Sequence, residues 1–160
     1  MAKVYEFKGA RKTRVELNGT TLRIQRVGFM SSLDYWFNGD VTFDVLDLIG
    51  IEIKEPGFSN GFIHFILPGS YSSIGGSLLL ALNDKNAVIF TDDEFGMIQE
   101  LKKNIDDLRA LEDKRKREDA RVQVDAEIER QGWLLATGRI PLEEFNEKKK
   151  NLLEYRRINT

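Results

Sequence analysis

Few side chains in this chain have the types and spacing that catalysis or metal binding requires. His64 is the only histidine of 160 residues and there is no cysteine, so a zinc site would lack the ligands that it normally uses. Because His64 lies between Ile63 and Phe65 in an apolar run, we expect it to be a core or core-edge residue of a strand. No metal ion and no cofactor are expected.

Two other groups of residues have the composition of a binding site but lack the spacing of a known binding motif. Asp40, Asp44 and Asp47 could bind a divalent cation or act as acid and base, but their spacing fits no known cation loop. Gly75-Gly76 resembles a phosphate-binding loop only in composition, since no Lys-Ser or Lys-Thr follows it. We interpret the aspartates as outward strand and turn residues and the glycines as an inter-strand loop. An enzyme is therefore not expected.

Aromatic and apolar side chains are the better candidates for function, as anchors for a protein partner. Three aromatic residues follow one another at positions 35–37 and cannot all face inward on one strand. They are either a core pair with an edge aromatic or a partner anchor, because buried aromatic residues dominate interface energetics. In the C-terminal part, Trp133 lies off the stripe of its helix. The candidate partner-binding residues are Tyr35, Trp36, Phe37, Trp133, Phe145 and Leu152.

Charge is unevenly distributed along the chain. The formal net charge is −2, which does not favour attraction of the whole molecule to nucleic acid or anionic lipid. Residues 1–26, however, hold seven basic residues against two acidic ones. These are either outward positions of strands or a basic face for an anionic partner. The candidate basic face consists of Lys8, Arg11, Lys12, Arg14, Arg23 and Arg26.

The first ninety residues show the period of two that is typical of half-buried strands. Asn18-Gly19 predicts a two-residue hairpin loop, which would set Val15 opposite Leu22 and Thr13 opposite Ile24. Turn formers bound each of the remaining short runs. These predict further strands near Val41–Phe43, Gly50–Lys54, Gly61–Leu67, Ser77–Leu82 and Ala87–Thr91.

After Asp92 the period changes to that of helices. One apolar stripe predicts a helix that covers the sheets: Phe95, Ile98, Leu101, Ile105, Leu108 and Leu111. Residues 112–121 are charged with both signs mixed, which indicates a solvated helical extension. Thr137-Gly138 then separates two short helices, and Pro141 suits the first turn of the second. We therefore expect an α+β protein with a sheet domain at 1–111, a charged helical linker at 112–121 and a helical hairpin at 122–160.

Two segments resemble known families. Residues 54–69, together with Val4-Tyr5-Glu6-Phe7 and Asn38-Gly39-Asp40, are similar to a bacterial PH-like domain family of unknown function. That resemblance implies a seven-stranded antiparallel β-barrel or sandwich, capped by a C-terminal helix. Residues 138–149 resemble the SHOCT family of short C-terminal helical modules, with Pro141 in place of the usual Ser or Thr. That resemblance implies oligomerisation or partner docking, and the pairing of the two modules is typical of prophage-borne proteins.

Taken together, the residues predict a non-enzymatic interaction or scaffold protein that binds a protein partner or itself. A homo-oligomer is expected and a small-molecule substrate is not. The alternative is peripheral binding to anionic lipid or nucleic acid through the basic N-terminal strands. The N-terminal residues do not have the pattern of a signal peptide, and no stretch approaches the roughly 18 apolar residues of a membrane span. We therefore expect a cytoplasmic location, with a possible role in phage immunity or in countering host defence as one hypothesis.

Overall fold

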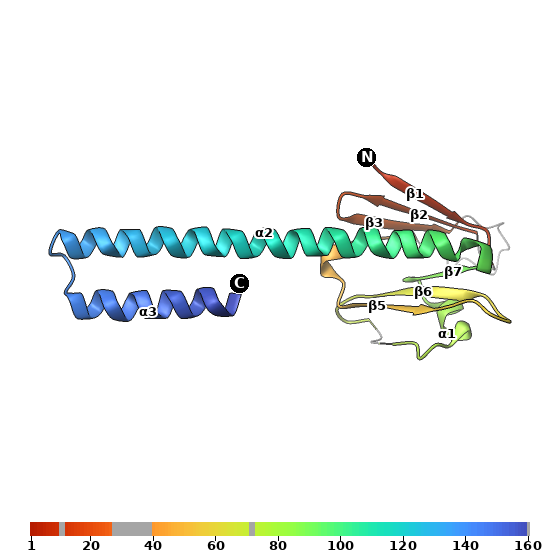
Figure 1. Cartoon of the computed structure of the whole chain (residues 1–160). Helices are drawn as coiled ribbons and strands as arrows, with labels where there is room; N and C mark the ends of the chain where they lie inside the picture. Colours follow the sequence, from red (N-terminus) through yellow and green to blue (C-terminus); the bar gives the residue numbers. More distant parts are fainter. Residues whose placement is uncertain (10–11, 27–39, 71–72, 160) are drawn as a thin grey trace. The chain divides into compact units, whose positions relative to one another are not determined.

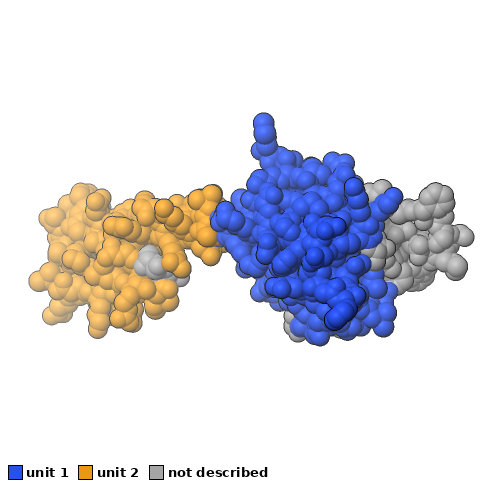
Figure 2. Space-filling view, turned by 45° about the vertical axis from the view of Figure 1, so that its right-hand side comes forward, with its two compact units in different colours: residues 1–109 blue, residues 110–160 orange. Residues whose placement is uncertain are grey.

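A computed structural model describes residues 1–9, 12–26, 40–70 and 73–159. The chain is an α+β protein (Figure 1) that divides into two compact units, Met1–Arg109 and Ala110–Thr160, coloured separately in Figure 2. Each unit is described by itself below. Within the described ranges, no helix combines the length and the apolar character that crossing a membrane requires.

The first unit is built on two antiparallel sheets. Strands β1–β4 form one sheet in sequence order, and β5–β7 form the other. The four-stranded sheet contains β1 (Lys3–Phe7), β2 (Thr13–Asn18), β3 (Thr21–Arg26) and β4 (Val41–Asp44). The three-stranded sheet contains β5 (Gly50–Lys54), β6 (Gly61–Ile66) and β7 (Ala87–Phe90). Across the described residues no ladder joins the two sheets, so they do not form a closed barrel there.

Within the described ranges, the helical elements are two 3₁₀ turns and three α-helices. They are η2 (Val45–Asp47), α1 (Leu78–Asn83), η3 (Asp92–Glu94), α2 (Phe95–Ala136) and α3 (Leu142–Asn159). A capping box joins Thr91 and Glu94 at the start of η3, which satisfies backbone donors that a helix leaves unpaired at its N-terminus. The acidic residues at 92–94 therefore begin the helical segment, as their sequence pattern predicts.

The main core lies between the sheets and under the start of α2. Inward residues of the strands, such as Val15, Leu22 and Phe65, are fully buried. Ile98, Leu101 and Ile105 of α2 pack against them with no exposed surface, and Figure 1 shows α2 running between the two sheets. The predicted covering helix is confirmed over these residues. Leu111, the last member of the predicted stripe, is 66% exposed and lies outside this core.

Strand β6 is buried on both of its faces. On the face away from the main core, Phe62 joins a second cluster with Ala81 of α1. The sequence prediction of a strand at Ser77–Leu82 is wrong, because this segment forms α1. The Ser77 hydroxyl caps the helix through Leu80 N, and the leucine and alanine residues that follow favour a helix. Periodicity cannot separate a short apolar helix from a buried strand.

The β2–β3 hairpin has a different register from the predicted one. Val15 pairs with Ile24 and Leu17 with Leu22, so the loop consists of Gly19-Thr20 instead of Asn18-Gly19. Gly19 has a φ of 57° and no described non-glycine residue has a positive φ, which suits a loop with glycine in its first position. Because the error is two residues, every side chain keeps its predicted face.

The close approach of Gly61 to its neighbours gives a test of this packing. A Cβ atom at Gly61 would lie 2.6 Å from both Lys54 O and the Phe90 ring, whereas one at Gly57 would meet nothing within 4 Å. We predict that Gly61→Ala lowers the free energy of unfolding by roughly 1–3 kcal/mol through overpacking. Gly57→Ala, the matched control in the same hairpin, should leave it nearly unchanged or slightly raised. Urea unfolding followed by circular dichroism measures both; equal values for the two variants would contradict the packing described.

Candidate interaction surfaces

The second unit is a pair of antiparallel helices. Its first helix is the part of α2 that begins at Ala110, and its second is α3. Between them Gly138 has a φ of 68°, and the amide of Arg139 donates to Leu134 O at 2.9 Å, closing the end of α2. Asp125 of α2 accepts a hydrogen bond from Arg156 of α3 at 2.8 Å. We call this unit the hairpin.

Few side chains of the hairpin are buried. Of its side chains within the described residues, only Val124 (3% exposed) and Gln131 (5% exposed) are buried. Gln131 donates to Glu127 at 2.6 Å, while its Oε1 has no hydrogen-bond partner in the described part of the chain. Other apolar side chains of the hairpin, such as Ile128, Leu135 and Leu152, are only half-buried, which makes a small core for a helical unit of this length.

Large apolar side chains lie on the outside of the hairpin instead. Seven of them are exposed: Leu111, Val122, Trp133, Leu142, Leu153, Tyr155 and Ile158. Single exposed apolar residues are normal on protein surfaces, but a concentration of them in one small unit is typical of an interaction surface. Of these seven, only Trp133 is among the partner-binding residues predicted from the sequence, because the pattern of the other six also suits a core.

The predicted partner-binding residues of the hairpin differ in their exposure. Trp133 is 54% exposed, and the guanidinium of Arg139 lies 4.6 Å from the centre of its ring. Phe145 is half-buried, with Lys149 Nζ 5.7 Å from its ring centre. Leu152 is half-buried and lines a hollow of 600 Å³ with Gln131 and neighbouring polar residues. The predicted cluster Tyr35, Trp36 and Phe37 lies outside the described residues.

The hollow of the hairpin is polar on its α2 side. Hydrogen bonds from Gln131 and Arg130 hold the pKa of Glu127 below its usual value. On α3, Lys148 pairs with Glu144 at 2.6 Å. Glu127, Arg130 and Lys148 give the hollow a charged rim, while Leu152 and Tyr155 of α3 line it with apolar surface.

The candidate basic face is divided in the structure. Lys8, Lys12, Arg14 and Arg23 are exposed, and Arg26 is half-buried. Arg26 donates to Asp84 O and Ala87 O at 2.7 and 3.0 Å, a structural role. Arg11 lies outside the described residues.

The exposed arginines of the four-stranded sheet face acidic residues. Glu6 lies opposite Arg14 and Glu16 opposite Arg23 on neighbouring strands. Arg23 also forms an ion pair with Asp40 at 2.6 Å, and its hydrogen bond holds the pKa of that carboxyl below its usual range. The outer face of this sheet therefore alternates in charge and is not uniformly basic.

His64 is fully buried on the side of β6 that α1 covers, and two carboxylates flank it. Its Nε2 lies 3.3 Å from Asp84 Oδ2, and its Nδ1 lies 3.9 Å from Glu52 Oε2. The carboxylates sit at opposite ring nitrogens and the ring has no exposed surface, so a substrate has no access to it. No group of described histidines and carboxylates has the arrangement of a metal site.

The loop that contains Gly75 and Gly76 forms an anion-binding nest, and the carboxylate of Glu52 occupies it. Glu52 accepts hydrogen bonds from Ile74 N at 3.0 Å, Gly76 N at 2.8 Å and Ser73 Oγ at 2.9 Å. Gly75 and Gly76 have φ values of 58° and 71°, the conformation that aims successive amides at an anion. Burial raises the pKa of Glu52, but these hydrogen bonds outweigh it and hold that pKa below its ordinary value.

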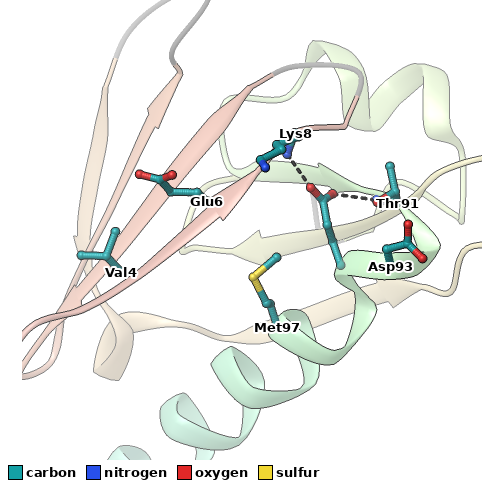
Figure 3. A pocket seen from close by; sticks show the side chains of 7 residues that line it. Val4, Glu6, Lys8, Thr91, Asp93 and Met97 are labelled. Atoms are coloured by element: carbon teal, nitrogen blue, oxygen red, sulfur yellow. Dashed lines mark hydrogen bonds between the residues drawn. The ribbon is translucent and has the colours of Figure 1, made fainter.

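A second hollow, of 780 Å³, lies between the edge strand β1 and the start of α2. Figure 3 shows Val4 and Glu6 on β1 and Lys8 just after it, with Asp93 and Met97 on the helical side of the hollow. The buried carboxylate of Glu94 accepts from Lys8 N and from Thr91 N. Glu94 thus supplies an acceptor to the amide of Lys8, the residue that directly follows the edge strand β1.

These features define an α+β protein of two compact units, with buried polar groups that serve its own structure and an apolar helical surface that remains uncovered. The chain belongs to the DUF4429 family, a domain of unknown function, whose sequence profile matches residues 15–106. The match begins in β2 and ends in the first part of α2, within the first unit. The comparison with curated proteins finds no match, and neither does the comparison with solved structures.

The nest around Glu52 predicts a dependence of stability on pH. Because the folded protein lowers the pKa of Glu52, the stabilisation is complete above the ordinary glutamate value of 4.5 and disappears as the pH falls below it. At pH 7 we expect Glu52→Gln to cost roughly 1–3 kcal/mol of unfolding free energy, and the difference from wild type to shrink at low pH. Asp47→Asn, at an exposed carboxyl, is the control. Urea titrations of the wild type and both variants at pH 7 and at a pH below 4.5 measure these unfolding free energies. A loss of unfolding free energy in Glu52→Gln that is equally large at both pH values would contradict the prediction.

The role of Glu94 predicts a local effect at β1. Glu94→Ala leaves the amides of Lys8 and Thr91 without their acceptor, at a cost of roughly 1–3 kcal/mol. We expect faster hydrogen exchange at both amides, measured by NMR. Asp93→Ala, at the exposed neighbour, should leave the two rates close to those of the wild type. The assignment of Glu94 would be wrong if its variant exchanged as slowly as that control.

Proposed function

We propose that the chain is a non-enzymatic interaction protein that self-associates through the hairpin and binds protein partners through its first unit. The observation that carries this proposal is the imbalance of the hairpin, which buries one apolar side chain and exposes seven large ones. Ordering two helices costs conformational entropy that such a small core does not offset. A second copy supplies the missing apolar surface, because two hairpins can combine as a four-helix arrangement.

The family resemblances support the same function. The likeness of residues 138–149 to SHOCT modules points to oligomerisation or docking, and the hairpin is the unit that contains them. The PH-like resemblance suits a unit with seven described strands in two sheets and a helix packed between them. We assign this PH-like unit to the binding of a protein partner, and a prophage origin would give the assembly a role in immunity or counter-defence.

Binding to anionic lipid or nucleic acid is the weaker alternative. It requires a surface of one sign of charge that can neutralise several phosphates. The described arginines on the outer face of the four-stranded sheet instead lie opposite Glu6 and Glu16. A steep fall of affinity for DNA or anionic vesicles with added salt would favour this alternative over protein binding.

Analytical ultracentrifugation of the full chain tests the proposal. We expect a mass that rises with concentration above that of one chain, because apolar association follows mass action. A chain that ends after Leu111 should keep its sheet signal in circular dichroism and sediment as a monomer. Lys150→Glu, at an exposed charge of α3, is the control that should associate like the wild type.

Two results would contradict the proposal. A full chain that remains monomeric at every accessible concentration would remove self-association. A shortened chain that unfolds would show that the hairpin forms part of the core of the first unit.

A further inference from the structure

We infer that the second copy binds along one face of α2, antiparallel and centred on Val122, an arrangement that rests on the proposed self-association and specifies its geometry. We call this face the α2 stripe. Its members follow one another at spacings of four and three residues, and all are exposed. They are Leu111, Arg115, Glu118, Val122, Ala126, Glu129 and Trp133.

The α2 stripe lies on the side of α2 opposite to α3. Val124 and Gln131 mark the inner side, since they are the buried residues of the hairpin. Val122 lies two residues before Val124, and Trp133 lies two residues after Gln131. Two residues correspond to about 200° around a helix with 3.6 residues per turn. At exposures of 59% and 54%, Val122 and Trp133 retain most of their surface for a partner. The intramolecular packing of the hairpin therefore leaves the α2 stripe free.

The α2 stripe is symmetric in sequence about Val122. Leu111 and Trp133 lie equally far from it on either side, and so do Arg115 and Glu129. A two-fold axis through Val122 brings identical patches together, as a closed dimer requires. Two antiparallel copies then place Leu111 against the partner's Trp133, Arg115 against the partner's Glu129, and Val122 against the same residue of the partner. These three contacts pair apolar with apolar or opposite charges, and the remaining pair places Glu118 against the partner's small Ala126.

A parallel arrangement lacks this complementarity. It would place Arg115 against Arg115 and Glu129 against Glu129 of the partner, and like charges across an interface are repulsive. The present partner of Arg115 does not prevent the antiparallel pairing. Arg115 bonds to Glu112 at 2.8 Å within the same helix with 69% of its side chain exposed, and such surface pairs contribute little.

Cysteine cross-linking tests the geometry, because the chain has no cysteine of its own. With a short bis-maleimide reagent, Val122→Cys should give a covalent dimer rapidly. Leu111→Cys should not link to itself, since the two copies of this position would lie roughly 33 Å apart along antiparallel helices. A mixture of Leu111→Cys and Trp133→Cys should give the mixed dimer. Lys116→Cys, exposed on α2 but off the α2 stripe, measures random collision.

Charge exchange provides an independent test. Arg115→Glu should weaken dimerisation about tenfold, because two symmetry-related pairs change from attraction to repulsion. The double variant Arg115→Glu with Glu129→Arg should recover most of the affinity. Arg117→Glu, at an exposed residue off the α2 stripe, is the matched control and should change little. Circular dichroism verifies that each variant keeps its helix content.

The outcomes separate this inference from the proposed function. If the wild type self-associates but Val122→Cys links no faster than Lys116→Cys, the antiparallel α2 pairing is wrong and self-association stands. If Leu111→Cys links efficiently to itself, the helices are parallel and the inference is overturned. A failure of Glu129→Arg to restore the Arg115→Glu variant removes the predicted ion pair. A wild type that is monomeric at all concentrations rejects both.

Discussion

The packing of Ile98, Leu101 and Ile105 between the two sheets is the interaction on which the rest of the structure depends. The sheets share no ladder in the described part of the chain. Apolar contact through this helical stripe holds them around one core, together with the hydrogen bonds from Arg26 of β3 to Asp84 O and Ala87 O. The same helix continues to Ala136 without a break. One element therefore packs on the core of the first unit and provides half of the hairpin, and Leu111 is the first member of its predicted apolar stripe that is exposed.

The polar groups that could have formed a catalytic site are used within the fold. Glu52 fills the nest of the glycine loop, Glu94 supplies an acceptor to the amide that follows β1, and His64 lies between two carboxylates without exposed surface. The two glutamates accept hydrogen bonds from backbone amides, whereas the ring nitrogens of His64 have no hydrogen-bond partner within the described residues. The large apolar side chains that stay exposed on the hairpin are the observation on which the proposed self-association rests.

Much of the architecture could be predicted from the sequence, for identifiable reasons. Period two predicted strands β1, β2 and β3 because one face of each is buried, and the break at Gly138 predicted the end of α2. The register of the β2–β3 turn at Gly19 and the helix α1 (Leu78–Asn83) could not be predicted, because either loop position satisfies the alternation and a short apolar run suits both helix and strand. The nest of Glu52 depends on residues more than twenty positions apart, and only the fold brings them together.

The charged part of α2 has a mechanical consequence for the chain. From Asp113 to Asp119 every side chain is exposed, so helix propensity and ion pairs along the same helix are what keep this segment wound. A helix of that kind opens locally at little cost while packed elements on either side remain closed. It also contains four consecutive basic residues, Lys114 to Arg117. A trypsin-like protease would therefore cut there first, and the chain would fall into two fragments that correspond closely to its two units.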